Sequence, residues 1–119
     1  MIKGFKKQTD ILTQKEIDIA HYIAPYLKMK IGKKNAVTNK RMILGIQKKY
    51  DKKISSSRLR KIINYLRTHS IVEKLVATSN GYYISTSKKE TDNYLLSLRQ
   101  RISAITEIAE CLEKQNKNY

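Results

Sequence analysis

Apolar residues recur at helical spacing in four separate segments of the chain. The first segment follows a capping box, Thr13-Gln14-Lys15-Glu16, in which the threonine oxygen and the glutamate side chain each accept a backbone N–H. Its apolar positions fall three or four residues apart: Ile17, Ala20, Ala24 and Leu27. Pro25, the only proline, should end or kink this helix around Ala24. We therefore expect a helix from residue 14 to about residue 24 or somewhat beyond.

Two further helical stripes lie close together in the middle of the chain. The second segment follows Thr38, a suitable N-cap, and its apolar face runs to about residue 50: Met42, Ile43, Ile46 and Tyr50. The third segment follows three serines, residues 55–57, any of which can cap a helix, and it has its own stripe: Leu59, Ile62, Ile63 and Leu66. Residues 51–54 make a short turn between them. Two helices joined in this way are a helix-turn-helix candidate.

After the third helix the pattern changes to short β-prone runs. Residues 75–78 and 81–85 flank Ser79 and Asn80, and Asn80-Gly81 can supply the two positive φ angles of a type I′ hairpin turn. Successive strand residues point to opposite faces, so we expect one of Tyr82 and Tyr83 to be buried and the other exposed. A basic loop at residues 28–35 leads to Ala36-Val37, which we interpret as a short edge strand.

The last helical segment is the longest and opens with a second capping box, Ser87-Lys88-Lys89-Glu90. Its apolar residues alternate three and four apart, as in a coiled coil: Leu95, Leu98, Ile102, Ile105, Ala109 and Leu112. We expect this stripe to form a homodimer. Tyr94 and Ile108 make the face wider than a two-stranded seam requires, which leaves docking on its own domain or on another protein as alternatives.

Together these elements predict a mainly α fold with a small β-hairpin (α+β). We divide the chain into a flexible basic arm (1–11), a helix-turn-helix domain with a hairpin (12–87), and a C-terminal amphipathic helix with a short polar tail (88–119). The order of elements in residues 38–86 resembles that of winged helix-turn-helix domains. Gly81-Tyr82-Tyr83-Ile84, followed by a capped helix with Leu98-Arg99-Gln100-Arg101-Ile102, is similar to small winged-helix proteins of phages and mobile elements. That resemblance implies DNA binding in transcriptional control, replication or packaging of such an element.

Charge points to the same class of partner. The 119 residues contain 25 Lys and Arg against 10 Asp and Glu, a formal net charge of +15. Residues 1–87 hold 19 of the basic and 5 of the acidic side chains, so the excess is concentrated before the last helix. Such a field attracts polyanions, and we expect double-stranded DNA as the partner. Binding to an anionic lipid surface is a minor alternative, and RNA is disfavoured because no exposed aromatic platform is evident.

In winged-helix domains the third helix enters the major groove. With its apolar stripe facing inward, Ser57, Lys61, Asn64 and Thr68 lie opposite, flanked by Arg58, Arg60 and Tyr65. Arg58 and Lys61 suit guanine, Asn64 suits adenine, and Ser56 and Ser57 with the helix N-terminus suit a phosphate. Further phosphate contacts are expected from four basic residues near the second helix: Lys33, Lys34, Lys40 and Arg41.

The sequence does not favour catalysis. The acidic residues are few and scattered, and neither His21 nor His69 has another ligand at metal-binding spacing. Gly32-Lys33 lacks the other residues of a phosphate-binding loop. We expect no enzyme activity, metal, cofactor or small-molecule substrate. The main alternative to DNA binding is a protein-interaction adaptor with the same fold acting near DNA.

The location of the protein is inferred from weaker signals. No apolar stretch approaches the length of a signal peptide or of a membrane span. The single cysteine, Cys111, excludes an internal disulfide framework and suits a reducing compartment. We therefore expect a cytoplasmic protein without membrane attachment.

Overall fold

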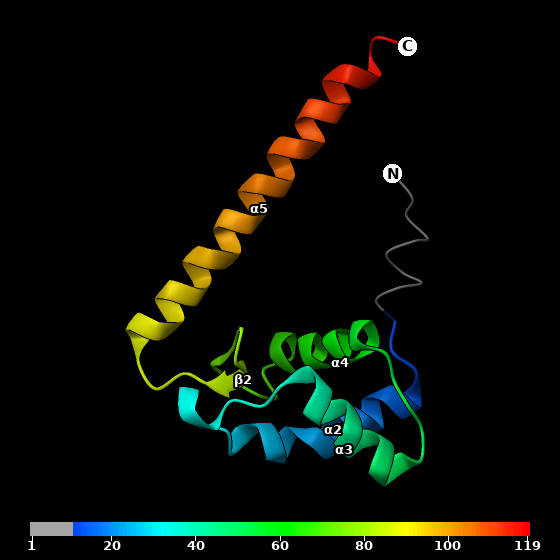
Figure 1. Ribbon diagram of the computed structural model, residues 1–119, viewed down its shortest axis with the longest axis vertical. Coiled ribbons are helices and arrows are strands. Elements are labelled where there is room, and N and C mark those ends of the chain that lie inside the picture. Colours follow the sequence, from blue (N-terminus) through cyan, green and yellow to red (C-terminus); the bar gives the residue numbers. More distant parts are fainter. Residues whose placement is uncertain (1–10) are drawn as a thin grey trace. The chain divides into compact units, whose positions relative to one another are not determined.

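A computed structural model of the protein describes residues 11–119, and it is mainly helical with one antiparallel hairpin, as predicted (Figure 1). Of the predicted basic arm, only Ile11 lies within the described residues, and it is exposed. The elements follow in the order α2 (Gln14–Lys28), η1 (Lys33–Asn35), α3 (Asn39–Tyr50), α4 (Ser56–Thr68), β1 (Leu75–Thr78), β2 (Gly81–Ile84) and α5 (Lys88–Asn116). The chain divides into two compact units between residues 86 and 87, and each is described by itself.

The capping box at the start of α2 is formed as predicted. The Glu16 N–H donates to the Thr13 hydroxyl oxygen at 3.1 Å, and the Thr13 N–H donates to the Glu16 carboxylate at 2.9 Å. The helix continues past Pro25 to Lys28, one turn beyond the predicted end near residue 24. Pro25 is exposed, whereas Leu27 in the added turn is completely buried. Burial of Leu27 therefore holds the last turn in place despite the proline.

The next two helices begin at Thr38, as predicted, and at Ser55, the first of the three serines that the sequence offered as caps. The side chain of Thr38 accepts the backbone N–H three residues ahead, and Ser55 does the same for α4. Asp51 ends α3 in the left-handed conformation, and Ile54 is buried within the turn that follows. The turn between α3 and α4 is therefore anchored in the core.

The core is centred on α4, which packs against both α2 and α3. The apolar stripe predicted for α4 is confirmed, since all four residues are at most 1% exposed: Leu59, Ile62, Ile63 and Leu66. On α2 the stripe is wider than predicted, because Ile19 and Ile23 are also buried while Ile17 is half-buried. A close-packed centre of this kind holds the outer face of α4 in a fixed orientation.

The hairpin joins the two predicted strands through Ser79 and Asn80, but its turn is not of the predicted type. Thr78 pairs with Gly81, so Ser79 and Asn80 are the two loop residues. Asn80 is not among the described residues with positive φ, and the expectation of a type I′ turn at Asn80-Gly81 is wrong. Gly81 is the first residue of β2, where it pairs with Thr78, and it has a φ of 115°. A side chain at Gly81 would place its Cβ 2.3 Å from the carbonyl oxygen of Val37. The glycine is required by this close approach and by its backbone conformation.

Both hairpin tyrosines are buried, which corrects the expectation that one would be exposed. Tyr82 is 7% exposed and belongs to the main core, while Tyr83 on the other face is 5% exposed beside its cross-strand partner Val76. Alternation along the strand fails to separate them because neither face of this part of the hairpin is open to solvent. Val37 forms the predicted edge contact as a single bridge, exchanging both backbone hydrogen bonds with Tyr82.

The second unit consists of α5 and the last three residues. Its N-cap is Ser87, whose hydroxyl accepts the Glu90 N–H at 3.2 Å. The helix is 29 residues long, and none of its residues is buried. No helix within residues 11–119 combines the length and the apolar character needed to cross a bilayer.

Candidate nucleic-acid interface

One face of α4 is polar and accessible along the whole helix. Ser57, Arg60, Asn64 and Thr68 are exposed, and Lys61 is half-buried between them. Ser56, at the first position of the helix, is exposed as well. There is no acidic residue in α4, so this face presents hydrogen-bond donors and positive charge without a competing carboxylate of its own.

Arg58, one of the predicted base contacts, is engaged within the domain. Its Nε donates to one carboxylate oxygen of Glu16 at 2.7 Å and a terminal nitrogen donates to the other at 2.5 Å. The same guanidinium also donates to the carbonyl oxygen of Ile11 at 3.2 Å. The bidentate pair joins α4 to α2, and the Arg58 side chain is only 32% exposed. Its predicted contact with guanine stays a prediction, and it requires this ion pair to open.

The ion pair with Arg58 has a large effect on the pKa of the Glu16 carboxyl group. The hydrogen bonds from Arg58 lower the pKa of Glu16 from 4.5 to about 2, and the N–H of Thr13 adds to this effect while burial opposes it. The same ion pair raises the pKa of the Arg58 guanidinium. Glu16 is therefore charged at neutral pH and is matched by Arg58, so it does not place a free negative charge beside α4.

Two other predicted contacts on α4 are partly used for local packing. The ring of Tyr65 lies 4.3 Å from that of His69 and meets His21 edge-on at 6.3 Å. The Thr68 hydroxyl donates to the carbonyl oxygen of Asn64 at 2.9 Å and keeps its acceptor capacity. Tyr65 is half-buried, whereas Thr68 is exposed at the C-terminal end of the polar face of α4.

The four basic residues predicted to contact phosphates lie in two short segments. Lys33 and Lys34 begin the 3-10 turn η1, and Lys40 and Arg41 lie in the first turn of α3. All four are exposed, and the first turn of α3 has no acidic residue. The free N–H groups of that turn add a partial positive charge to the two side chains.

The six residues predicted for dimerisation share one face of α5 and are accessible. Four of them are large and 43–67% exposed: Leu95, Ile102, Ile105 and Leu112. Ala109 is also exposed, and Leu98 is half-buried. Leu96 and Ile108 are further exposed apolar side chains of the helix, so α5 presents an extensive apolar surface to solvent.

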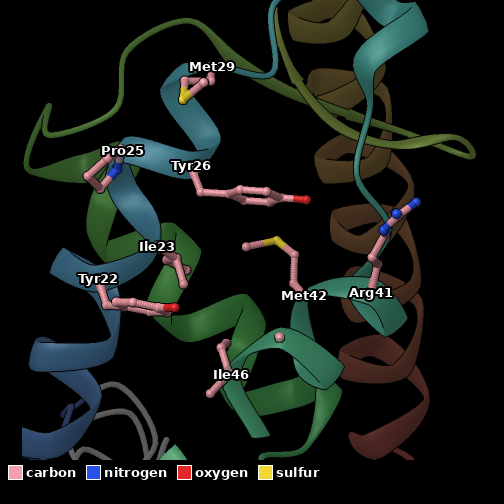
Figure 2. Close-up of a pocket in the computed structure, with 9 residues that line it drawn as sticks. Tyr22, Ile23, Pro25, Tyr26, Met29, Arg41, Met42 and Ile46 are labelled. Carbon is pink, nitrogen blue, oxygen red and sulfur yellow. The ribbon is translucent and has the colours of Figure 1, made fainter. Parts of the chain in front are cut away.

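Sequence reasoning missed an apolar groove between α2 and α3, shown in Figure 2. It has a volume of about 540 Å³. Tyr22 and Tyr26 of α2 flank the Met42 side chain, and Arg41 lies to one side of them (Figure 2). The remaining lining residues are Ile23, Pro25, Met29, Gly45 and Ile46. The signal was present in the sequence, because Tyr22, Tyr26 and Met29 form a second apolar stripe at 4,3 spacing on α2.

Comparisons of the chain with protein-family models, with curated protein sequences and with solved structures found no match. Within residues 11–119, no group of three or more His, Cys, Asp or Glu side chains has a geometry suited to a metal ion.

Proposed function

We propose that the protein binds duplex DNA as a winged-helix homodimer, with the exposed face of α4 in the major groove. The observation that carries this proposal is the composition of that face: Ser57, Arg60, Lys61 and Asn64 are all hydrogen-bond donors, and no acidic residue occurs in the helix. The core residues of α4 hold this face outward. A rigid helix with donors along one side is suited to reading base edges.

Within this proposal the residues have different tasks. Lys61 donates to guanine, and Asn64 forms a bidentate pair with adenine. Ser56 and Ser57, together with the free N–H groups of the first turn of α4, bind a phosphate. The basic residues of η1 and of the first turn of α3 bind phosphates without reading sequence. Their high charge supplies affinity that falls as salt rises.

The proposed role of α5 is to link two such domains. A homodimer presents two α4 helices to two half-sites, which increases both affinity and selectivity for a palindromic sequence. The exposed apolar stripe of Leu95, Ile102, Ile105 and Leu112 supports this role, because a stripe of this size is rarely left in contact with water.

The experiment begins with selection of duplexes from a random pool by the wild-type protein, followed by binding measurements at several salt concentrations. Asn64→Ala should weaken binding to the selected site by about 1–3 kcal/mol and relax the preference at one base pair. Lys40→Ala should weaken binding to all duplexes and reduce the salt slope by about 1. Lys114→Ala in α5 makes the same change in charge and should leave both the affinity and the salt slope nearly unchanged.

Arg58 is a poor choice for this test, because its substitution also breaks the pair with Glu16. If wild type selects no duplex, or if Asn64→Ala retains the full base preference, the assignment of α4 is wrong. A protein-interaction adaptor would then be the better candidate, and the exposed apolar surface of α5 is the observation that favours it. Selection of single-stranded over duplex nucleic acid would equally contradict the proposal.

A further inference from the structure

The α2–α3 groove has the size and the lining of a small-molecule site. Its volume of about 540 Å³ lies within the range of such sites, about 300–1,000 Å³. Met42 and Ile46 are buried and form its floor, whereas Tyr22 and Tyr26 on its wall are 47% and 40% exposed. Aromatic and aliphatic side chains that stay partly exposed around a buried floor are suited to an apolar ligand.

Gly45 keeps the groove open on the side of α3. It lies in the interior of this helix and lines the groove, and a Cβ added there would have no heavy atom within 4 Å. Glycine in a helix interior is less stable than alanine, and here it relieves no clash. An occupant that comes close to the backbone of α3 accounts for a glycine at this position.

The apolar lining is short along both helices. On α2 it runs from residue 22 to residue 29, about 10 Å along the axis. Asp18 lies one turn before Tyr22, and Lys49 lies one turn beyond Gly45, so charged side chains follow the apolar ones at these two ends. A stable protein–protein contact covers about 800 Å² on each partner, and a partner helix would have to extend over these charges. The dimensions therefore favour a small molecule.

Positive charge surrounds the groove. Arg41 lines it, and its guanidinium makes no ion pair within residues 11–119. Lys30 places its ammonium 4.5 Å from the centre of the Tyr26 ring, and Lys49 places its own 5.5 Å from that of Tyr22. None of the residues that line the groove is acidic. An anionic ligand is therefore attracted by three cations and meets no carboxylate in the groove.

The polar groups of the lining lie toward one side. The Tyr26 ring extends across the groove, and its hydroxyl points to the side where Arg41 lies (Figure 2). This hydroxyl makes no hydrogen bond within the described residues. A carboxylate can accept hydrogen bonds both from a hydroxyl and from a guanidinium. The tyrosine rings and the sulfur of Met42 suit an aromatic body beside that carboxylate.

We propose that the α2–α3 groove binds a small aromatic carboxylate, with its ring beside Tyr22, Tyr26 and Met42 and its carboxylate on Arg41. Arg41 is also one of the residues proposed to bind a DNA phosphate. A ligand that holds the Arg41 guanidinium in the groove therefore competes with DNA and weakens its binding. This regulatory effect rests on the proposed function, whereas the ligand site itself does not.

The ligand site is tested without DNA, by titrating ¹⁵N-labelled protein with 2-naphthoate. The amide signals of Met42, Gly45 and Ile46 should shift and reach saturation. The neutral analogue 2-naphthamide has the same rings and should bind about tenfold more weakly, because it lacks the charge-assisted hydrogen bond. Absence of saturable shifts at these residues, or equal affinity for the two compounds, would overturn the proposal.

Matched variants test the two halves of the site. Arg41→Gln should lower the affinity for 2-naphthoate about tenfold. Lys28→Gln removes the same charge from an exposed residue of α2 that does not line the groove, and it should change the affinity less than about twofold. Gly45→Leu should abolish binding by filling the groove. Gln47→Leu adds the same side chain to α3 outside the groove and should retain binding.

A protein occupant would give a different result. If the signals of Met42, Gly45 and Ile46 shift with protein concentration in the absence of 2-naphthoate, the groove is an interface between copies of the chain and the proposal is wrong. The same conclusion follows if Arg41→Gln and Lys28→Gln bind 2-naphthoate equally well.

Duplex binding at saturating 2-naphthoate tests the regulatory effect. The wild type should bind duplex DNA more weakly, by no more than the loss that Arg41→Gln causes, and the variant itself should not respond to 2-naphthoate. An unchanged affinity of the wild type would refute the competition for Arg41. Failure to bind any duplex would instead contradict the proposed function, while saturable shifts in the titration without DNA would still support the ligand site.

Discussion

The ion pair between Glu16 and Arg58 makes a large and specific contribution to stability. Glu16→Gln removes the negative charge but keeps an oxygen able to accept the Thr13 N–H. Lowering of the Glu16 pKa from 4.5 to about 2 corresponds to about 3 kcal/mol at most, at 1.36 kcal/mol for each pH unit. Because the Arg58 side chain is 32% exposed and regains water when released, we expect a loss of about 2 kcal/mol at pH 7.

The lowered pKa of Glu16 determines how the stability of the protein changes with pH. Glu16 has a lower pKa in the folded protein than its ordinary value, so its contribution is complete above pH 4.5 and is lost as the pH falls toward 2. The wild type should therefore lose this stability across that window, whereas Glu16→Gln has no charge to lose there. The difference between the two proteins should shrink from about 2 kcal/mol at pH 7 to near zero at pH 2.

The assay is urea unfolding followed by circular dichroism at several pH values. Asp18→Asn is the matched control, because Asp18 is an exposed acid of the same helix whose side chain accepts a hydrogen bond only from Gln14 among the contacts described. It should change the free energy of unfolding by less than about 0.5 kcal/mol. A difference between wild type and Glu16→Gln that stays constant from pH 7 to pH 2, or that is already absent at pH 7, would refute the reasoning.

Three further substitutions test the local structure by thermal or urea unfolding. Gly81→Ala should destabilise the domain by about 2 kcal/mol or more, because its Cβ would lie 2.3 Å from the Val37 carbonyl oxygen; unchanged stability would contradict the close approach of these segments. Ser55→Ala should cost about 1 kcal/mol by removing the cap of α4, and a neutral result would mean that water replaces the cap. Gly45→Ala should instead stabilise the protein by roughly 0.5–1 kcal/mol, since its Cβ meets nothing; a loss of stability would show that α3 packs more tightly there than the structure indicates.

Much of the candidate interface followed from the sequence because it depends on local interactions. The caps at Thr13, Thr38, Ser55 and Ser87 are all formed, since each needs only a side-chain oxygen and a backbone N–H three residues away. The buried stripe of α4 also follows from spacing alone, and once it faces inward the polar residues of the helix must face outward. The fold class and the exposed donors of α4 were therefore predictable.

The tertiary structure decided the features that join distant parts of the chain. Arg58 and Glu16 are 42 residues apart, and only the packing of α4 on α2 brings the two side chains together as an ion pair. Tyr83 is buried because of what surrounds the hairpin, which alternation along one strand does not reveal. The α2–α3 groove likewise exists only once both helices are placed on α4. Spacing along a chain determines which residues share a face, whereas the partner of that face depends on contacts between segments far apart in sequence.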